Sequence, residues 1–527
     1  MVISQQAVKE FRARRLRDLG ALKLLPRKEL DRQLKARGAV FVTPPRDYQK
    51  VAVLAGLKLS SLYLMLDPGL GKSKVTLDLF RSRRARGEAS RLLVLVPGLT
   101  NVEGWREQVA EHAPDLRFAG LDGGTRVQKQ EALEDRGADV VCVTYQGWLS
   151  LTCVRVEKGK GKRKRMGFKL DVREHDRVAS GFDMVAWDEC TFIKNHMSVS
   201  FSSARRMHRV IPLRLCLSGT PFDKDPVDLW AQFYILDAGE TLGDTLGIYR
   251  GAYFNEKEDY WRGTVYTFDQ RNKSELRKVL RNRAVRYKDH ECLDLPPLSG
   301  GMLSNSYMAR YVRWPDEAWT YYQELMNDLV AARNDPDFVE NTYIRMRQVC
   351  SGFLPVDDPD TGERHVVFFK ENPLLDALVG LLGELPPDRK VLVFNEYKES
   401  GQLICARLKK EKVPHVRIFS GTPDKKAAMR QFKQDMSTRV LVGSRAVCFG
   451  LNLQVANYAV IYESPDSAIV REQLERRIYR QGQERHTYIW DLVVRNSVGP
   501  QILKAVRAGK NLSEELMRSE DPRSWLT

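Results

Sequence analysis

One stretch constrains this chain more than any other: Leu-Asp-Pro-Gly-Leu-Gly-Lys-Ser at residues 66–73. An apolar run, residues 62–66, precedes it, and residues 75–80 after it are typical of a helix. A strand, a glycine-bearing loop ending in Lys-Ser and a helix form the order that a phosphate-binding loop needs, because backbone N–H groups and the N-terminus of the helix converge on phosphate oxygens. The stretch therefore predicts a nucleotide-binding α/β domain.

Each position in the loop has a candidate role. Backbone groups of the glycine turn would hold phosphates, the lysine amine would reach the β- and γ-phosphates, and the serine hydroxyl would bind Mg²⁺. The candidate residues are Gly69, Leu70, Gly71, Lys72 and Ser73. The fit to G-x-x-x-x-G-K-[ST] is partial, because Leu66 occupies the position of the first glycine. A plain glycine turn before a basic helix is the alternative for this fragment alone.

A second nucleotide contact is predicted just upstream. Pro44 and Pro45 break the chain, and a helix opens at Arg46. Gln49 lies in its first turn, and a glutamine amide can both donate to and accept from an adenine edge. Arg46 and Gln49 are therefore candidate nucleotide-binding residues.

Further apolar runs predict the rest of a sheet. Residues 91–97 and 139–145 are β-rich and separated by helix-like sequence, which implies a doubly wound parallel sheet. Another run, residues 182–187, ends in Asp188 and Glu189. At the carboxyl end of a parallel strand, Asp188 would hold Mg²⁺ and Glu189 would orient and activate an attacking water.

A strand ending at Leu217 leads into Ser218-Gly219-Thr220-Pro221. The hydroxyls of Ser218 and Thr220 are candidates to link the metal site to the second half of the molecule. An ordinary turn is the alternative.

The net charge of +17 favours a polyanionic partner, nucleic acid above all. Residues 1–40 are basic and helix-like, and either contact nucleic acid or pack beside the first domain. Residues 155–181 resemble an exposed loop or hairpin, for which a nuclear import signal, a DNA-contacting loop and a solvated insertion all fit; we favour the DNA-contacting loop. Its candidate nucleic-acid-binding residues are Lys158, Lys160, Lys162, Arg163, Lys164 and Arg165.

Other features exclude whole classes of protein. We find no run of about eighteen apolar residues and hence no transmembrane helix, and the N-terminus lacks the apolar core of a signal peptide. The eight cysteines are scattered, with no C-x-x-C pair and no zinc-type cluster. They predict small buried thiols in a reducing compartment, the cytoplasm.

The second half repeats the alternation of strands and helices without a phosphate loop. Strands are predicted at residues 390–394, 416–421, 439–444 and 459–463. On one helix, Gln473, Arg477 and Arg480 would share a face, and both arginines would act as arginine fingers on a γ-phosphate. A solvated basic helix face is the alternative on spacing alone.

The order of these motifs resembles helicase superfamily two, and within it the Swi/Snf-like DNA translocases of compact bacteriophage and bacterial type. Residues 473–483 match the family's Q-x-x-x-R-x-x-R-x-G-Q pattern. Residues 276–283 resemble its basic helix before the linker between lobes, and residues 343–350 a helix of its second lobe. The resemblance covers about residues 41 to 510.

The resemblance implies two RecA-like doubly wound α/β lobes in tandem with helical insertions. ATP and Mg²⁺ would bind between the lobes, and Gly450 and Gln473 would also contact the nucleotide. The implied divisions are a basic extension 1–40, a first lobe 41–295 with insertions 155–181 and 225–290 (the latter helical), a second lobe 296–510 with a helical insertion 315–353, and a tail 511–527.

Three departures from the family pattern stand out. Leu66-Asp67-Pro68 replaces Asp-Glu-Met, and Val447 and Cys448 replace paired glycines. Cys190 and Thr191 stand where Ala and His are usual, so any coupling carried by that histidine must be made differently.

We therefore expect a monomeric, nucleic-acid-stimulated ATPase that translocates along duplex DNA and remodels DNA or DNA–protein complexes. Replication, recombination or transcription proteins are expected partners, membranes are not, and a bacteriophage-encoded protein would act in the host cytoplasm and nucleoid. A strand-separating or branch-migrating helicase, an RNA helicase and a non-hydrolysing ATP switch that recruits other proteins remain as alternatives.

Overall fold

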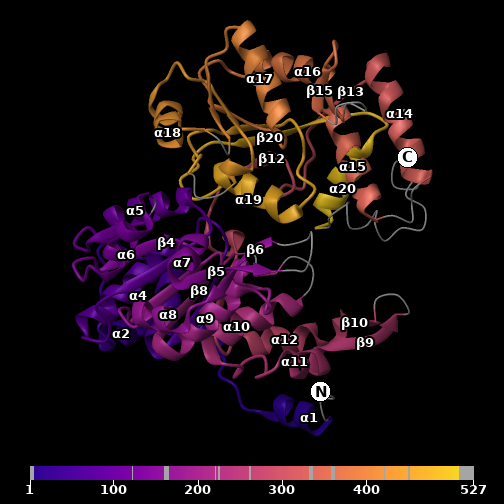
Figure 1. Ribbon diagram of the computed structural model, residues 1–527. Helices are drawn as coiled ribbons and strands as arrows, with labels where there is room; N and C mark the ends of the chain where they lie inside the picture. Colours follow the sequence, from indigo (N-terminus) through magenta and orange to yellow (C-terminus); the bar gives the residue numbers. More distant parts are fainter. Residues whose placement is uncertain are drawn as a thin grey trace. The chain divides into compact units, whose positions relative to one another are not determined.

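The computed structural model describes residues 5–121, 123–158, 165–219, 221–222, 226–259, 263–331, 336–357, 363–419, 422–448 and 452–509. The chain divides into two compact units, Met1–Leu293 and Asp294–Thr527 (Figure 1). Each unit is built on a seven-stranded sheet whose strand pairs are all parallel, so the predicted fold class, two parallel-sheet α/β lobes in tandem, is confirmed.

The sheet of the first unit carries the predicted strands in an order that differs from their order in the chain. From edge to edge it runs β11 (Ala284–Tyr287), β1 (Ser61–Leu66), β8 (Leu213–Leu217), β7 (Met184–Asp188), β2 (Leu92–Val96), β4 (Val140–Thr144) and β3 (Phe118–Gly120). Its helices include α3 (Asp47–Lys58), α4 (Lys72–Ala85), α5 (Leu99–His112), α6 (Arg126–Glu134), α7 (Tyr145–Thr152), α9 (Val199–Val210) and α10 (Leu229–Asp237).

Both faces of this sheet are buried, which explains why its strands are almost continuously apolar. Within β1, Leu62, Leu64 and Leu66 belong to a core shared with α3, α4 and α5. Tyr63 and Met65 belong to the opposite core, which includes side chains of α7, α9 and α10. The carboxyl ends of the strands are thereby left as the edge on which loops can present functional groups.

The predicted insertions of the first unit have mixed structure. Strands β5 (Cys153–Lys158) and β6 (Arg165–Leu170) pair antiparallel, as expected for the hairpin among the predicted alternatives. Helix α8 (Val172–Ala179) follows, where only a loop or hairpin was expected.

The segment 225–290, predicted to be helical, also contains strands. Beside α11 (Leu246–Tyr253) and α12 (Lys273–Leu280) lies a second hairpin, β9 (Phe254–Asp259) and β10 (Gly263–Phe268) (Figure 1). Strand β11 joins the main sheet through β1. Short length and an interrupting Arg286 conceal this strand from a search for long apolar runs.

The basic N-terminal segment packs on its own unit. It forms α1 (Gln5–Ala13), a 3₁₀ turn (Leu19–Leu24) and α2 (Arg27–Ala36). Arg14 donates to the carbonyl oxygens of Gly239 (3.3 Å) and Thr241 (2.5 Å), and Arg17 pairs with Glu240 at 2.9 Å. These arginines are therefore used for intramolecular docking, which favours the second of the two predicted alternatives.

The second unit has the sheet order β12 (Leu298–Gly300), β20 (Thr487–Val494), β19 (Tyr458–Ile461), β16 (Val391–Phe394), β18 (Val440–Gly443) and β17 (His415–Ile418), with β13 (Ala309–Val312) also pairing β20. Its helices are α14 (Asp316–Ala331), α15 (Pro336–Cys350), α16 (Pro373–Glu384), α17 (Lys398–Lys410), α18 (Lys425–Gln434), α19 (Ala468–Ile478) and α20 (Val498–Arg507) among the described residues. Strands β14 (Phe353–Asp357) and β15 (Arg364–Phe368) form a separate hairpin.

A buried ionic cluster fixes α19 against this sheet. Arg471 donates to both carboxylate oxygens of Asp491 at 2.6 and 2.9 Å and to Glu475 at 2.6 Å. Glu475 in turn accepts the backbone N–H groups of Met302 and Leu303. A bidentate, fully hydrogen-bonded arginine is the arrangement in which buried charges are tolerated.

The cysteines behave as small apolar side chains. All eight are free thiols, five of them buried and three half-buried. In the described part of the chain, no helix has both the length and the apolar character that crossing a membrane requires.

Candidate functional site

The phosphate loop connects β1 to α4 through two left-handed glycines. Gly69 has φ 92° and Gly71 has φ 78°, conformations that disfavour any residue with a Cβ atom. Gly71 is the N-cap of α4, so the first N–H groups of the helix face the loop. Leu70 buries its side chain and donates its N–H to Asp67 O at 3.1 Å, which tightens the turn.

Lys72 and Gln49 complete the loop. The Lys72 ammonium donates to Leu66 O at 2.9 Å, at the end of β1. Gln49 is buried: its Oε1 accepts the Arg46 N–H at 3.0 Å and its Nε2 donates to Leu70 O at 3.2 Å. A Cβ on Gly71 would lie 2.5 Å from Gln49 Nε2, so the glutamine braces the loop directly. Its predicted contact with adenine stays a prediction.

Asp188 is held at the end of β7 by bonds to both carboxylate oxygens. The indole N–H of Trp105 donates to Oδ2 at 2.9 Å, and the Glu189 N–H donates to Oδ1 at 3.1 Å. Burial and the neighbouring Glu189 raise the pKa of Asp188 to about 6, against the opposing effects of Trp105 and the Lys72 charge. Two carboxyl groups and a lysine thus share one electrostatic environment.

Glu189 occupies a strained position. Its backbone is left-handed, with φ 47° and ψ 56°, a conformation that costs a non-glycine residue on the order of 1–3 kcal/mol. The Ser218 hydroxyl donates to Glu189 Oε2 at 3.3 Å. This hydrogen bond ties one carboxylate oxygen of Glu189 to the segment after β8.

Sheet order explains why these residues meet. Leu217, at the end of β8, is in register with Leu64 of β1 on one side and with Asp188 of β7 on the other. The segment after β8 therefore lies between the phosphate loop and the Asp188-Glu189 turn. Gly219 has no room for a side chain there, because a Cβ would lie 2.7 Å from the Pro68 ring and 3.0 Å from Leu66 O. Lys72, Ser218, Asp188 and Glu189 thus gather at three adjacent strand ends.

Sequence reasoning missed two residues of this site, Trp105 and Tyr145. The Tyr145 hydroxyl donates to the Asp188 carbonyl oxygen at 2.9 Å, while Trp105 holds the carboxylate. Tyr145 is the last residue of the predicted strand 139–145, and Trp105 lies on the helix after the predicted strand 91–97. A polar-tipped aromatic side chain buried near a strand end is a usable signal, since such groups find hydrogen-bond partners.

The arginines of the second unit are arranged differently from the prediction. Helix α19 ends at Ile478, so Arg480 does not share a helical face with Gln473 and Arg477, although Gln473 is buried on that helix. Instead, Arg477 Nε donates to Cys448 O at 2.8 Å and Arg480 Nη1 donates to Asn452 Oδ1 at 2.6 Å. Tyr479 is the C-cap of the helix, and Gly482 has a left-handed φ of 88°. The segment that contains Arg480 therefore does not continue the helix.

The two arginines still lie close together. Burial and the charge of Arg477 lower the pKa of Arg480 to about 10. In the part of the chain that the structure describes, Arg480 Nε is buried with no hydrogen-bond partner. Adjacent guanidinium groups repel each other, so this arrangement favours an anion.

Several predicted residues lie outside the described residues: Thr220, Gly450, Lys160, Lys162, Arg163 and Lys164. Lys158 and Arg165 are described as backbone only, paired with each other at the ends of β5 and β6.

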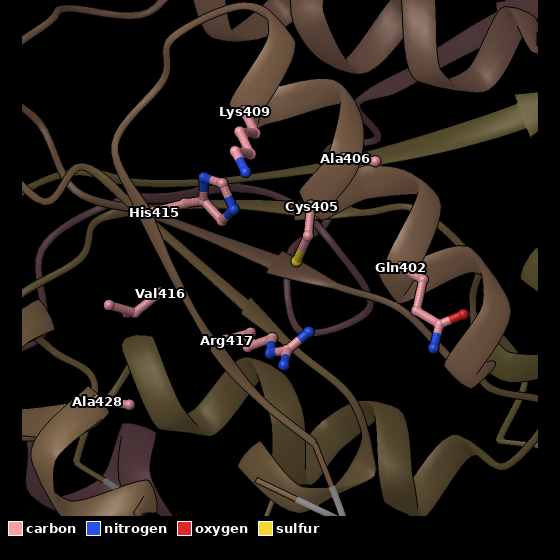
Figure 2. Close-up of a pocket in the computed structure, with 8 residues that line it drawn as sticks. All are labelled: Gln402, Cys405, Ala406, Lys409, His415, Val416, Arg417 and Ala428. Atoms are coloured by element: carbon pink, nitrogen blue, oxygen red, sulfur yellow. The ribbon is translucent and has the colours of Figure 1, made fainter.

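The second unit also has a hollow of about 500 Å³ between α17, β17 and α18. Figure 2 shows Cys405 and Lys409 from α17, and His415 and Arg417 from β17, around it. Burial raises the pKa of the Cys405 thiol to about 11, so the thiol is protonated and unreactive near neutral pH. None of the predicted nucleotide-site residues lines this hollow.

Comparison with known proteins gives matches along most of the chain. Residues 48–348 match the SNF2-related domain, and residues 373–482 match the helicase conserved C-terminal domain. The chain belongs to the SNF2-related family of helicase-like ATPases.

Individual relatives are distant. The chain is 22% identical over 92% of its length to a Bacillus subtilis protein named as an ATP-dependent helicase/translocase, YwqA, and 24% identical over 89% to the Arabidopsis thaliana ISWI chromatin-remodeling complex ATPase CHR17. It spans 49% and 42% of those two proteins. The solved Sulfolobus solfataricus SWI2/SNF2 ATPase core in complex with dsDNA is 19% identical, covers 92% of this chain and 95% of its own, and gives a TM-score of 0.39.

Three of the residues that depart from the family pattern in this SNF2-related chain make contacts near the site. Asp67 accepts the backbone N–H of Asp289 at 3.2 Å and so ties the phosphate loop to the last helix of its unit, α13 (Asp289–Cys292). Cys448, in place of a glycine, supplies the carbonyl oxygen that receives Arg477. Thr191 lies with its hydroxyl 3.4 Å from Glu189 O.

The donors present fit a divalent cation that is held partly by phosphate. Across the described residues, no group of three or more His, Cys, Asp and Glu side chains could hold a metal ion. Mg²⁺ commonly takes one or two protein oxygens and completes its shell with phosphates and water. Asp188 and the Ser73 hydroxyl, at a strand end and at the start of α4, are donors of that kind.

Proposed function

We propose that this protein is a DNA-stimulated ATPase that uses hydrolysis of Mg²⁺-bound ATP to translocate along double-stranded DNA. Membership of the SNF2-related family makes it a helicase-like ATPase. The residue roles, the metal ion and the DNA track are the additional steps of the proposal.

The observation that carries the proposal is the gathering of Lys72, Ser218, Asp188 and Glu189 at the ends of β1, β8 and β7. In the proposed roles, Lys72 and the N–H groups of the glycine loop hold phosphates, and Ser73 and Asp188 hold the cation. Bound there, Mg²⁺ would neutralise charge that develops on the phosphates. Glu189, directed by its left-handed backbone and by Ser218, orients the attacking water.

Arg477 and Arg480 are proposed to supply positive charge to the same phosphates. Their mutual repulsion and the buried Arg480 Nε are relieved by an anion, which supports this role. An arginine that acts only in the transition state affects hydrolysis more than it affects nucleotide binding.

Duplex DNA is proposed as the track. The net charge of +17 favours a polyanion, and the sequence between β5 and β6 is strongly basic. Contacts to phosphate backbone would give little sequence preference and a steep salt dependence.

The test is ATP turnover on a panel of duplex DNA, single-stranded DNA, forked DNA and RNA, with displacement of a DNA-bound protein as the second readout. We expect the strongest stimulation by duplex DNA, and displacement without strand separation. Unwinding of forked DNA would indicate a strand-separating helicase and contradict translocation without strand separation. Stronger stimulation by RNA than by DNA would indicate that the protein moves along RNA. A wild-type protein with no ATP turnover on any nucleic acid would indicate a non-hydrolysing ATP switch.

A further inference from the structure

A buried polar cluster lies directly beneath the Asp188-Glu189 turn. It consists of Tyr63 on β1, Cys190 after the turn and Gln232 on α10, each with 0% of its surface exposed. The Tyr63 hydroxyl donates to Gln232 Oε1 at 2.5 Å. Cys190 Sγ lies 3.0 Å from the Tyr63 hydroxyl oxygen and 3.3 Å from Gln232 Oε1. One end of the Gln232 amide is thus attached to the residue that follows Glu189.

The other end of the same amide holds the segment that carries Ser218. Gln232 Nε2 donates to Pro221 O at 2.7 Å and to Asp228 O at 2.9 Å. Both N–H groups and the carbonyl oxygen of the amide are therefore used. Gln232 bridges the two chain segments whose side chains meet in the Ser218–Glu189 hydrogen bond.

The placement of a glutamine here is unusual for its surroundings. Gln232 lies in the helix Leu-Trp-Ala-Gln-Phe-Tyr-Ile-Leu, whose neighbouring side chains are almost all buried. Burying an amide costs free energy unless each polar group is hydrogen-bonded, and an apolar residue would fill the space without that requirement. A fully satisfied buried network instead fixes the relative position of the parts that it joins.

We propose that Gln232 is a positioning residue for ATP hydrolysis: by holding Cys190 through one end of its amide and Pro221 through the other, it sets the Ser218–Glu189 contact and hence the direction of the Glu189 carboxylate. This inference rests on the proposed role of Glu189. Gln232, which lies in neither segment, thereby connects the Asp188-Glu189 turn to the segment after β8.

The test compares Gln232→Met, which keeps the volume and removes the amide, with wild type. Turnover with duplex DNA and binding of a fluorescent ATP analogue are measured at a temperature where circular dichroism shows both proteins folded. We expect kcat to fall by about tenfold while nucleotide affinity changes by less than about threefold, because Glu189 acts on hydrolysis and not on binding. In a Ser218→Ala background, Gln232→Met should lower kcat by less than about twofold, because the Ser218–Glu189 contact that Gln232 sets is already absent.

A matched control separates positioning from general loss of a buried amide. Asn282 is also fully buried, accepts the Arg17 N–H at 3.1 Å and donates to Thr241 Oγ1 at 2.8 Å, in the same unit. Asn282→Leu should lower stability and leave the kcat of the folded protein within about twofold. If Gln232→Met does not fold, Tyr63→Phe removes only the hydroxyl that contacts Gln232, and we expect it to lower kcat several-fold.

An unchanged kcat in folded Gln232→Met, or equal costs in the wild-type and Ser218→Ala backgrounds, would overturn the inference and leave the proposed function intact. A wild-type protein without turnover would remove the proposed function and this inference with it.

Discussion

Each unit places a carboxylate near the end of a parallel strand, and the two differ in what surrounds them. Asp188 is the last residue of β7, is half-buried, and shares its environment with Lys72, Glu189 and the Trp105 indole. Glu463 comes just after β19, is buried, and accepts the Glu396 N–H at 2.6 Å and the Ser400 hydroxyl at 3.0 Å.

Burial raises the pKa of both groups. A raised pKa alone therefore does not mark a carboxylate as functional. The distinguishing features of Asp188 are a neighbouring lysine from a glycine loop and a second carboxylate held in a strained turn. Glu463 instead joins backbone and side-chain groups of its own unit, as a structural group does.

We expect the largest loss of ATP hydrolysis from removing Lys72, the lysine close to Asp188. Lys72→Ala should abolish nucleic-acid-stimulated hydrolysis, by about 10³-fold or more, because phosphate loses its only flexible cation from the loop. Steady-state phosphate release measures this. Turnover near the wild-type level would contradict the assignment of the loop.

Arg477→Ala tests the cationic part of the second unit. We expect a loss of about 10³-fold in hydrolysis with nucleotide binding retained, since an arginine finger acts on developing charge. Single-turnover hydrolysis and equilibrium binding separate the two effects. Equal losses in binding and hydrolysis would instead indicate an ordinary ground-state contact.

Trp105→Phe tests whether the bond to Asp188 Oδ2 orients that carboxylate. The ring stays and the N–H donor is lost, so we expect the Mg²⁺ concentration for half-maximal turnover to rise by about tenfold, the scale of lost outer-sphere support for a metal ligand. Excess Mg²⁺ should restore much of the rate. A metal titration that superimposes on the wild-type curve would remove Trp105 from the site.

The smallest effect should come from the second carboxylate. Because the folded-state pKa of Glu463 lies above its ordinary value of 4.5, ionisation of this group costs folding free energy. Its contribution to stability is present below pH 4.5 and is lost as the pH rises through the folded-state pKa. Glu463→Gln stays neutral, so we expect a Tm about 2–4 °C above wild type near pH 8, an advantage that disappears near pH 4.

Turnover per folded molecule of Glu463→Gln should stay within about twofold of wild type. Thermal unfolding across pH, with ATPase assays beside it, measures both quantities. A large loss of turnover in Glu463→Gln would contradict the claim that Glu463 has a structural role only.

The sequence predicts the strand ends and their residues well, because long apolar runs bounded by glycine or acidic residues are local signals. It fails where the decisive partner is distant. The Trp105–Asp188 and Gln232–Cys190 contacts depend on sheet order, which brings β8 between β1 and β7. The prediction that Arg480 shares a helix face with Gln473 and Arg477 is wrong, because sequence spacing alone extends the helix beyond Ile478. In the structure the helix ends there, with Tyr479 as its C-cap and Gly482 in a left-handed turn.

The most direct test of the account compares ATP binding with ATP hydrolysis in Glu189→Gln. The substitution keeps an acceptor for Ser218 and removes the carboxylate that we propose orients water. We expect binding of ATP within about threefold of wild type and hydrolysis, with duplex DNA present, reduced by at least about 10²-fold. Substantial turnover by this variant would contradict the assignment of Glu189 and with it the central claim about the site.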